Sequence, residues 1–587
     1  MKQFFKFLFA SCLGTFLAIG LLFFVLIMIG SVFSSKDTNV SSNSVLFLEL
    51  DNVIPEKTGN VNQGNFSFQS EKAIGVHRIK DLIKKAQTDK NINGIVYKAP
   101  AATTAGLVTN SILRDAIQEF RDSTDKFVYA YGDFFSNPSY LLASACDSIY
   151  ANPNGTVDIN GYSAMIPFMK EGLDKLGVKM NVFYAGDFKS ATEPFRRNDM
   201  SPQNKLQTRE YLTDYYNEFL EDVAESRGTT TANLKEVINQ LDFDNIDKCI
   251  ENDIIDAKVY WYEFEDIIRN KLGIAEGKDI SYVDIAEYDS KKFISKGSSS
   301  NEIAVVYAEG EIVYNDNNKG VVSEVKYHEI FDKLRRNKKL KAVVLRVNSP
   351  GGSAFSSDAI WREMKELQAK GIPVVASFGN YAASGGYYIA ARADKIVADP
   401  YTLTGSIGVF SMLPNVTELM NDKLGINFDT VQTSPHSVPL SPFFEVSAKE
   451  GMMMQKFTDD MYQKFLSRVA EGRDMTIDEV HQVAQGRVWT GRKAMEIGLV
   501  DELGGIKEAI DIAAELANIE DDYKVKEYPN IKKEVWEELL TEVMKEQAAH
   551  VSLSAQEQDL WSTYQEVRAI MRYREPMARL PFIVDVK

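Results

Sequence analysis

The sequence has little of what metal sites, redox motifs and nucleic-acid surfaces require. Its three cysteines, Cys12, Cys146 and Cys249, form no CxxC pair, so neither a metal site nor a redox motif is expected. Cys12 lies in the apolar N-terminus, which leaves at most one possible disulfide in the soluble part. Disulfide bonds are therefore not what holds this fold together. The formal net charge is −17 and no basic stripe stands out, which argues against nucleic-acid binding.

Histidine is also scarce, and this limits how a nucleophile could be activated. The five histidines are His77, His328, His436, His481 and His550. None of them lies in a motif around a matching acid, so a Ser-His-Asp triad has little support. The GxSxG elbow of the α/β-hydrolases is missing as well. If a serine of this chain reacts, its base has to be another group.

The chain does have length and one long apolar run. Its 587 residues predict two or more domains, each able to bury a sizeable core. Lys2 and Lys6 precede an uncharged, mostly apolar run at 7–33, and a membrane-spanning helix needs about 20 residues. The apolar core of a cleavable signal peptide is only about 7–15 residues long, so we expect residues 1–43 to be a membrane anchor. A removed signal peptide is the alternative. The two lysines favour a cytoplasmic N-terminus, with the soluble body on the far side.

The soluble part of the sequence is written twice. The stretch YGDFFSNPSYLLASACDSIYANP at 131–153 aligns without a gap with FGNYAASGGYYIAARADKIVADP at 378–400. Farther along, DYYNEFLEDVAESRG at 214–228 resembles DMYQKFLSRVAEGRD at 460–474 at nearly the same offset. Two separated blocks that share nearly one offset indicate a tandem duplication.

The duplication sets the predicted domains. We place the first copy at 44–295 and the second at 296–545. Their boundary falls in the Ser/Gly-rich stretch SKGSSSN at 295–301, a composition typical of loops. The last segment, 546–587, is a tail to which the sequence assigns no role.

Each copy alternates predicted strands and helices. In the second copy, short β-branched apolar runs at 303–308, 342–347 and 373–378 predict buried strands. Between the last two, SSDAIWREMKELQAKG at 356–371 predicts a helix, and an apolar stripe predicts another over 457–473. A strand, a crossover helix and a second strand imply a parallel sheet, so the fold class is α/β.

One serine of the second copy stands among alanines and glycines. Ser384 lies in NYAASGGYYIA at 380–390, where the small neighbours would let a substrate carbonyl approach. If Gly385 opens a helix, its free N–H and the helix dipole would favour a developing oxyanion. A packing contact between small residues is the alternative reading.

Two further motifs of the second copy accompany this serine. In VNSPGGSAF, Gly351 and Gly352 follow a predicted strand and could turn sharply to expose N–H groups, as an oxyanion hole requires. An ordinary glycine turn is the alternative. In TGSIGV, Ser406 could orient a base, although this motif also suits a tight turn.

The first copy lacks the serine but contains a lysine. It has Asn137 where the second copy has Ser384, and it lacks the glycine pair. It has instead YAGDFKSATEPF with Lys189, where the second copy has Pro435 or His436. A lysine deprotonated by burial can take the proton of a serine. In this interpretation each copy keeps half of a site.

The motifs SPGGS, YAASGGYYIA, TGSIGV and FKSATEPF resemble those of the long, duplicated signal peptide peptidase A proteins of peptidase family S49. The resemblance covers nearly the whole soluble chain, except the tail at 546–587. It implies a serine endopeptidase in which Ser384 is the nucleophile and Lys189 the general base. It also implies a crotonase-like fold, related to the Clp protease subunit, in each copy.

The same resemblance implies partners and a location. Substrates would be signal peptides already released by signal peptidase, together with other unfolded apolar peptides. The protein would be a bowl-shaped homotetramer with its active sites inside. It would lie in the bacterial inner membrane, anchored through 7–33, with its soluble body facing the periplasm. Neither a metal nor a cofactor is implied, and no nucleic acid.

Two other functions are compatible with such a fold. One is a crotonase-type enzyme acting on acyl-CoA, against which the predicted anchor and the Ser/Lys division argue. The other is a membrane scaffold without activity. The presence of Ser384 and Lys189 in different copies argues against the scaffold.

Overall fold

The computed structural model describes most of the soluble chain. The described residues are 14, 21, 40–60, 73–100, 105–289, 299–438, 440–520, 522–530 and 577–579. The predicted anchor at 7–33 lies outside them except for two isolated positions, as does most of the predicted tail. Among the described residues, no helix has the length and apolar character needed to cross a membrane.

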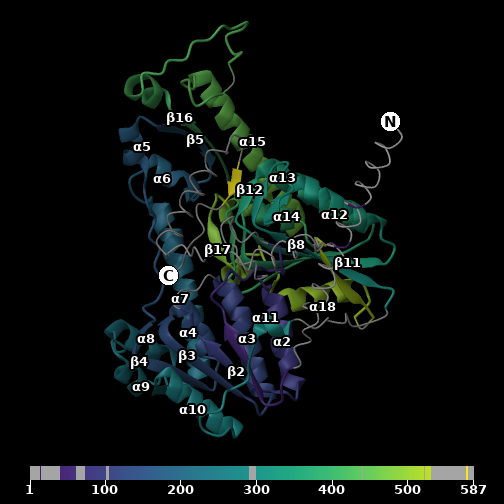
Figure 1. Ribbon diagram of the computed structural model, residues 1–587. Helices are drawn as coiled ribbons and strands as arrows, with labels where there is room; N and C mark the ends of the chain where they lie inside the picture. The colour runs from purple at the N-terminus through teal and green to yellow at the C-terminus, as the bar shows by residue number, and fades with distance from the viewer. Residues whose placement is uncertain are drawn as a thin grey trace, which may run out of the picture.

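The first copy forms a parallel sheet, seen in the lower part of Figure 1. Its six strands run in the order β6-β4-β3-β2-β1-β7, and every neighbouring pair is parallel. The strands are β1 (Ser44–Glu49), β2 (Ile92–Lys98), β3 (Phe127–Ser136), β4 (Ser148–Asp158), β6 (Ala257–Lys258) and β7 (Tyr282–Asp284). The helices of this copy are α2 (Val76–Thr88), α3 (Leu107–Ser123), α4 (Asn137–Ala143), α5 (Lys170–Leu176), α6 (Glu193–Arg196), α7 (Pro202–Arg227), α8 (Thr231–Gln240), α9 (Ile246–Glu251), α10 (Trp261–Leu272) and α11 (Ile285–Tyr288).

The second copy repeats this sheet strand for strand. The order β18-β14-β13-β11-β8-β19 is parallel throughout and corresponds to the order in the first copy. The strands are β8 (Glu302–Glu309), β11 (Leu340–Ser349), β13 (Val374–Ala383), β14 (Lys395–Ala398), β18 (Glu502–Leu503) and β19 (Lys524–Tyr528), to which β15 (Leu403–Gly405) and β17 (Val488–Thr490) are added beside β13. The helices are α12 (Glu324–Arg336), α13 (Ala354–Gln368), α14 (Gly385–Ala390), α15 (Ala448–Arg473), α16 (Ile477–Val483), α17 (Gly491–Glu496) and α18 (Ile506–Leu516).

Equivalent side chains hold equivalent strands in the two copies. Asp147 accepts a hydrogen bond from the N–H of Val128 at 2.7 Å. Asp394, its counterpart in the alignment, accepts one from Val374 at 2.7 Å. The predicted α/β class and the predicted duplication are therefore confirmed, down to matching hydrogen bonds. The crotonase-like or Clp-like character of each copy stays a prediction.

The predicted elements of the second copy are found with small shifts at their ends. The runs at 303–308 and 342–347 fall within β8 and β11, and the run at 373–378 lies almost wholly in β13. The predicted helix at 356–371 corresponds to α13. The helix predicted over 457–473 begins earlier, at Ala448, because Ser447 caps it by accepting the N–H of Glu450.

A third sheet joins the two copies. Its strand order is β10-β9-β12-β20-β16-β5, with β9 (Glu311–Val313), β10 (Val321–Ser323), β12 (Gly351–Ser353), β20 (Met577–Arg579), β16 (Val409–Asn415) and β5 (Lys179–Ala185). Strand β5 of the first copy pairs antiparallel with β16 of the second, from Lys179 opposite Asn415 to Ala185 opposite Val409. Both strands lie in the upper part of Figure 1. The segment after β5 is therefore carried to the second copy.

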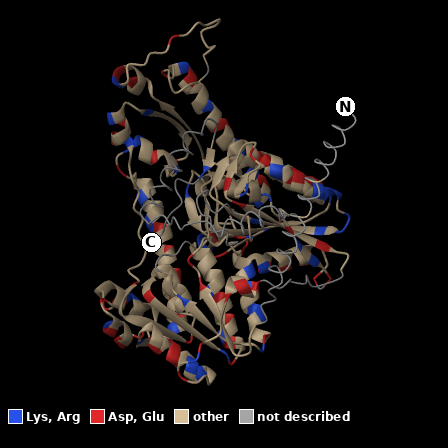
Figure 2. Ribbon diagram, viewed as in Figure 1, with Lys and Arg blue, Asp and Glu red and all other residues tan. Residues whose placement is uncertain are grey.

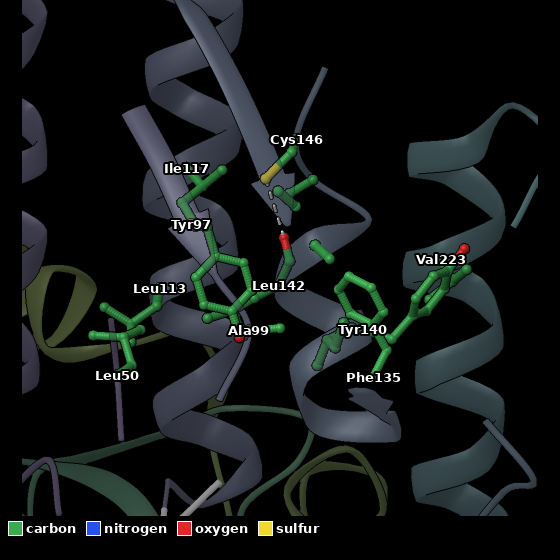
Figure 3. Packing of buried hydrophobic residues seen from close by; sticks show 14 of the residues in the cluster. Leu50, Tyr97, Ala99, Leu113, Ile117, Phe135, Tyr140, Leu142, Cys146 and Val223 are labelled. Carbon is green, nitrogen blue, oxygen red and sulfur yellow. Dashed lines mark hydrogen bonds between the residues drawn. The ribbon is translucent and has the colours of Figure 1, made fainter. Parts of the chain in front are cut away.

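Each sheet packs its helices through an apolar core. In the first copy, Tyr97, Ile117, Phe135, Tyr140 and neighbouring residues pack together between sheet and helices (Figure 3). Two cysteines, Cys146 and Cys249, are buried there as free thiols. In Figure 2, basic and acidic residues are interspersed along the helices.

Candidate active site

Three predicted site residues meet where the two copies join. Lys189 Nζ lies 2.8 Å from Ser384 Oγ, although the two residues are 195 positions apart. The same nitrogen lies 3.1 Å from both the hydroxyl and the carbonyl oxygen of Ser406. All three side chains are buried, and Lys189 is only 1% exposed. The predicted serine and lysine, one from each copy, are thus in hydrogen-bond contact within one chain.

The environment of Lys189 suits a base. Burial lowers the pKa of its amino group well below the ordinary lysine value, because the charged form loses its hydration. Its hydrogen-bond partners in the described part of the chain are neutral oxygens. A neutral amine at hydrogen-bond distance from a hydroxyl can accept the proton of that hydroxyl.

Ser384 stands at a strained junction between a strand and a helix. Strand β13 ends at Ala383 and α14 begins at Gly385, so the condition set for that glycine is met. Ser384 itself has φ 55° and ψ −116°, a conformation that costs a residue with a side chain about 1–3 kcal/mol. The N–H of Ser384 donates to Gly405 O at 2.8 Å and its carbonyl accepts from Tyr388 N at 2.9 Å, which holds the strained residue in place.

The glycine pair follows β11 directly, as expected, and it lies in a strand. Gly351 and Gly352 form the short strand β12, because Gly352 has a strand partner on each side, Ile312 in β9 and Ala578 in β20. The φ angles of the two glycines are +100° and +153°. A side chain on Gly352 would also lie 1.9 Å from Ile312 O, so this position requires glycine.

The predicted oxyanion donors are placed close together, but they are not equivalent. A Cβ on Gly351 would lie 2.7 Å from the nitrogen of Gly385, and a Cβ on Gly385 would lie 3.1 Å from the nitrogen of Gly352. The N–H of Gly351 already donates to Ser349 Oγ at 3.2 Å. Gly351 therefore provides close approach, while Gly352 and Gly385 are the two candidates for donating to an oxyanion.

A loop of the second copy packs directly against the segment that follows β5 and contains Lys189, which we call the lysine loop. The N–H of Phe188 donates to Gln485 O at 2.9 Å. A Cβ on Gly486 would lie 2.6 Å from Lys189 Cβ, so this glycine lets the two loops touch. Next to it, Arg487 O accepts the N–H of Ser406 at 2.7 Å. One loop thus contacts both the lysine and the serine that faces it.

Gln207 also supports the loop that contains Lys189, and nothing in the sequence pointed to it. Its buried amide nitrogen donates to Phe188 O at 3.1 Å and to Ser190 Oγ at 3.0 Å, on both sides of Lys189. Its oxygen accepts the N–H of Val488 in β17 at 3.2 Å. Gln207 therefore bonds the lysine loop of the first copy to the second copy. It lies in α7, outside every motif, so only the three-dimensional contacts identify it.

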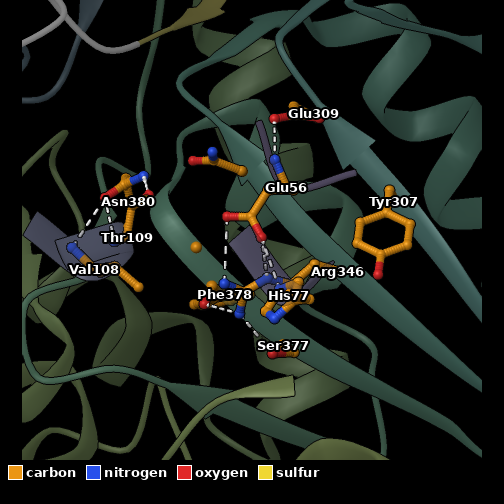
Figure 4. A network of polar contacts seen from close by, with 12 residues as sticks. Glu56, His77, Val108, Thr109, Tyr307, Glu309, Arg346, Ser377, Phe378 and Asn380 are labelled. Atoms are coloured by element: carbon orange, nitrogen blue, oxygen red, sulfur yellow. Dashed lines mark hydrogen bonds and ion pairs between the residues drawn. The ribbon is translucent and has the colours of Figure 1, made fainter. Parts of the chain in front are cut away.

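A buried ion pair, also unforeseen, joins the start of the first copy to the sheet of the second (Figure 4). Arg346 Nε lies 2.9 Å from Glu56 Oε2, and both side chains are almost fully buried. Burial by itself would raise the pKa of Glu56, but Arg346 and His77 outweigh it and lower this pKa to about 2. Arg346 also donates to Phe378 O in β13, the strand that leads to Ser384.

Near this pair a second carboxyl group is perturbed in the opposite direction. Glu309 accepts the N–H of Glu56 at 2.7 Å and the amide of Asn60 at 2.9 Å. Burial, together with the charge of Glu56, raises the pKa of Glu309 to about 7. No group of three or more His, Cys, Asp or Glu side chains suited to a metal ion occurs among the described residues.

Both copies of this sequence have known relatives. The sequence matches Peptidase family S49 twice, over 119–263 and 366–520. Protease 4 from Haemophilus influenzae is 32% identical over 86% of this chain and 85% of its own length. Serine protease SPPA, chloroplastic, from Arabidopsis thaliana is 32% identical over 77% of this chain and 67% of its own length. A ClpP1 mutant from Listeria monocytogenes matches 35% of this chain and 94% of its own, with a TM-score of 0.23 and 15% identity.

Proposed function

This chain belongs to peptidase family S49 and is a serine protease, and we propose that Ser384 is its nucleophile and Lys189 its general base. One observation carries the proposal, the 2.8 Å contact between a buried lysine and a buried serine from different copies. A stable core gains nothing from a buried lysine beside a strained serine. A Ser/Lys dyad, in contrast, requires these two groups in contact.

The reaction follows from the placement of these groups. Neutral Lys189 takes the proton of Ser384 as the serine oxygen attacks the peptide carbonyl carbon. The N–H groups of Gly352 and Gly385 receive the oxyanion. Lys189 then passes its proton to the leaving amine, and the acyl-enzyme is hydrolysed by a water molecule that Lys189 deprotonates. Ser406 holds the amine in place through its hydroxyl and carbonyl oxygens.

A peptide substrate would bind as an extended strand. In the third sheet, the three-residue strand β20 lies between β12 and β16 and pairs with both. A strand in that place satisfies its main-chain hydrogen bonds whatever its sequence, which suits an enzyme that digests unfolded peptides.

The biological substrates we propose are signal peptides already released into the membrane, and other unfolded apolar peptides. A membrane anchor at 7–33, with the body on the periplasmic side of the inner membrane, would concentrate the enzyme where such peptides lie. We also propose that the protein forms a homotetramer. Light scattering in detergent would check this by measuring the mass of the assembly.

Hydrolysis of a short ester and of a signal-peptide mimic by the full chain in detergent tests the dyad. We would compare wild type with Ser384→Ala and Lys189→Ala between about pH 6 and 10, a range that lies below the ordinary lysine pKa of about 10.4. Both variants should be inactive, and wild type should lose activity below an apparent pKa well under the ordinary lysine value. Ser226→Ala, in a hydrogen bond with Arg114 far from the dyad, is the matched control.

Three results would count against this function. Activity retained by Lys189→Ala would mean that another group is the base. A wild-type chain inert toward both esters and peptides would favour the membrane scaffold. Hydrolysis of acyl-CoA thioesters without peptide hydrolysis would favour the crotonase-type enzyme.

A further inference from the structure

The loop of the second copy that packs against the lysine loop, residues 484–487, has a strained residue at its centre. Gln485 has a φ of +54°, in the left-handed region that residues with a side chain rarely adopt. Its carbonyl accepts the N–H of Phe188 at 2.9 Å, and Arg487 O accepts the N–H of Ser406 at 2.7 Å. A strained backbone persists only where its surroundings hold it. Whatever holds Gln485 therefore also holds the segments on both sides of the candidate base.

Tyr462, on α15, supplies this holding contact. Its hydroxyl oxygen accepts the N–H of Gln485 at 3.1 Å and lies 3.0 Å from Nδ1 of His481, on α16. Tyr462 is buried, and burial raises its pKa to about 12, so the hydroxyl keeps its hydrogen. In the histidine tautomer whose Nδ1 is unprotonated, that hydrogen is donated to His481. The hydroxyl group is then fixed from one side by the histidine, and it fixes the strained residue on the other side.

The duplication gives an internal comparison for this contact. In the aligned stretches at 214–228 and 460–474, Tyr216 stands where Tyr462 stands. The hydroxyl of Tyr216 is buried and has no hydrogen-bond partner among the described residues. At the same offset the first copy has Lys235 in place of His481. The tyrosine is therefore present in both copies, and it is bonded to a histidine and a strained loop in the copy that contains the nucleophile.

We propose that Tyr462 is a positioning residue for the base. Its hydroxyl, oriented by His481, holds Gln485 and thereby keeps the lysine loop where Lys189 meets Ser384. This inference rests on the proposed function. Two hydrogen bonds, one on either side of Gln485, separate the hydroxyl from the lysine loop, so Tyr462 acts on the base through the main chain.

Loss of the hydroxyl would release the strained residue. The N–H of Gln485 would lose its acceptor, and its φ angle would relax toward the ordinary region. Gln485 O would then move away from the N–H of Phe188, the residue before Lys189. A looser lysine loop admits water, and a hydrated amine recovers a higher pKa. The base would thus be displaced from Ser384 and also protonated over a wider range of pH.

Tyr462→Phe in the full chain tests this role, because it removes the hydroxyl and keeps the ring. With the short ester in detergent, kcat should fall on the order of tenfold while KM stays the same, since no substrate contact is lost. The acidic limb of the pH–rate profile should shift to higher pH. Tyr216→Phe is the matched control in the other copy and should change neither. Tyr140→Phe, which removes a buried hydrogen bond to Ile254 O, should lower stability without altering kcat or the profile.

A second change in the same chain separates positioning from general damage. Glycine adopts a φ of +54° without the penalty that a side chain adds. Gln485→Gly combined with Tyr462→Phe should therefore keep the loop in place, restore most of the lost kcat and return the pH–rate profile toward that of wild type. The same glycine combined with Tyr140→Phe should bring no increase in kcat.

The inference is wrong if Tyr462→Phe folds and keeps the wild-type kcat, because the hydroxyl would then serve stability alone. A lower kcat with an unshifted profile, or no recovery in the double variant, would show that the loss does not pass through Gln485 and the lysine loop. An equal fall in Tyr140→Phe would show a general loosening of the fold. A wild type inert toward the ester would instead fail the proposed function, before any variant is compared.

Discussion

The two copies differ most at one junction that they share. In the first copy, β3 runs into α4 with Ser136 as an ordinary N-cap in the extended region, φ −88°. The next residue, Asn137, turns its amide to the backbone and donates to Gly161 O at 2.8 Å. In the second copy the corresponding residue is Ser384, which has a strained backbone and a side chain that faces Lys189. At this junction the strained backbone belongs to the copy that presents a nucleophile, which is where strain has a use.

The copies also differ in what they extend toward each other. The first sends β5 and the lysine loop onto β16 of the second. The second sends the loop that contains Gly486 back onto Lys189. Neither copy contains a complete site, so catalysis depends on how firmly the two are joined. The following changes test that dependence.

Lys189→Met should have the largest effect, and it should separate activity from stability. It removes the base, and loss of one member of a catalytic unit costs on the order of 10⁴-fold or more in kcat. The same change should stabilise the fold at pH 7. Burial lowers the pKa of Lys189, so in the window below the ordinary lysine pKa the unfolded chain binds a proton that the folded chain does not.

The sign of this stability effect can be checked by denaturant unfolding at several pH values. Below the ordinary lysine pKa, the wild-type free energy of unfolding should rise with pH by about 1.4 kcal/mol per unit relative to Lys189→Met. The advantage of the variant should therefore shrink as the pH approaches about 10. If Lys189→Met exceeded wild type in free energy of unfolding by the same amount at every pH, Lys189 would be charged in the folded protein.

Glu56→Gln should have the next largest effect, on stability. It leaves Arg346 buried without a charged partner, and breaking such a pair costs about 3–5 kcal/mol. Glu49→Gln is the control, because its pair with Lys98 is more than a third exposed and contributes little. Since the pKa of Glu56 is lowered to about 2, the difference between wild type and Glu56→Gln should persist above the ordinary carboxyl value and disappear as the pH falls toward 2.

Gln207→Leu should weaken the contact between the two copies without changing the nucleophile or the base. It removes the hydrogen bonds to Phe188, Ser190 and Val488, so the lysine loop should loosen and admit water. A hydrated lysine regains a higher pKa, so kcat should fall about 10- to 100-fold and the pH–rate profile should shift to higher pH. Gln240→Leu, at an exposed position of α8, should change neither. A fall in kcat with an unshifted profile would assign Gln207 a purely structural role.

These contrasts also show how far the sequence alone reaches. The strands at 303–308 and 342–347 are recognisable because buried parallel strands are continuous apolar runs. Ser384 and Lys189 are recognisable because the duplication shows what each copy lacks. The strand formed by the glycine pair could not be recognised, because its strand partners lie far away in the sequence and β20 comes from the tail. Gln207 could not be recognised, since its importance depends on which loops its amide reaches.

The smallest effect is expected from restoring a serine to the first copy. In a chain that carries Ser384→Ala, Asn137→Ser should restore no measurable ester hydrolysis, although it makes the two junctions more alike in sequence. No glycine pair follows the preceding strand in the first copy, and Lys189 is held at the other junction by Ser406. The change should cost only the hydrogen bonds between Asn137 and Gly161, about 1 kcal/mol of unfolding free energy. Any recovered activity that depends on Lys189 would mean that the lysine loop can reach both junctions, and that the joint between the copies is far looser than its buried contacts imply.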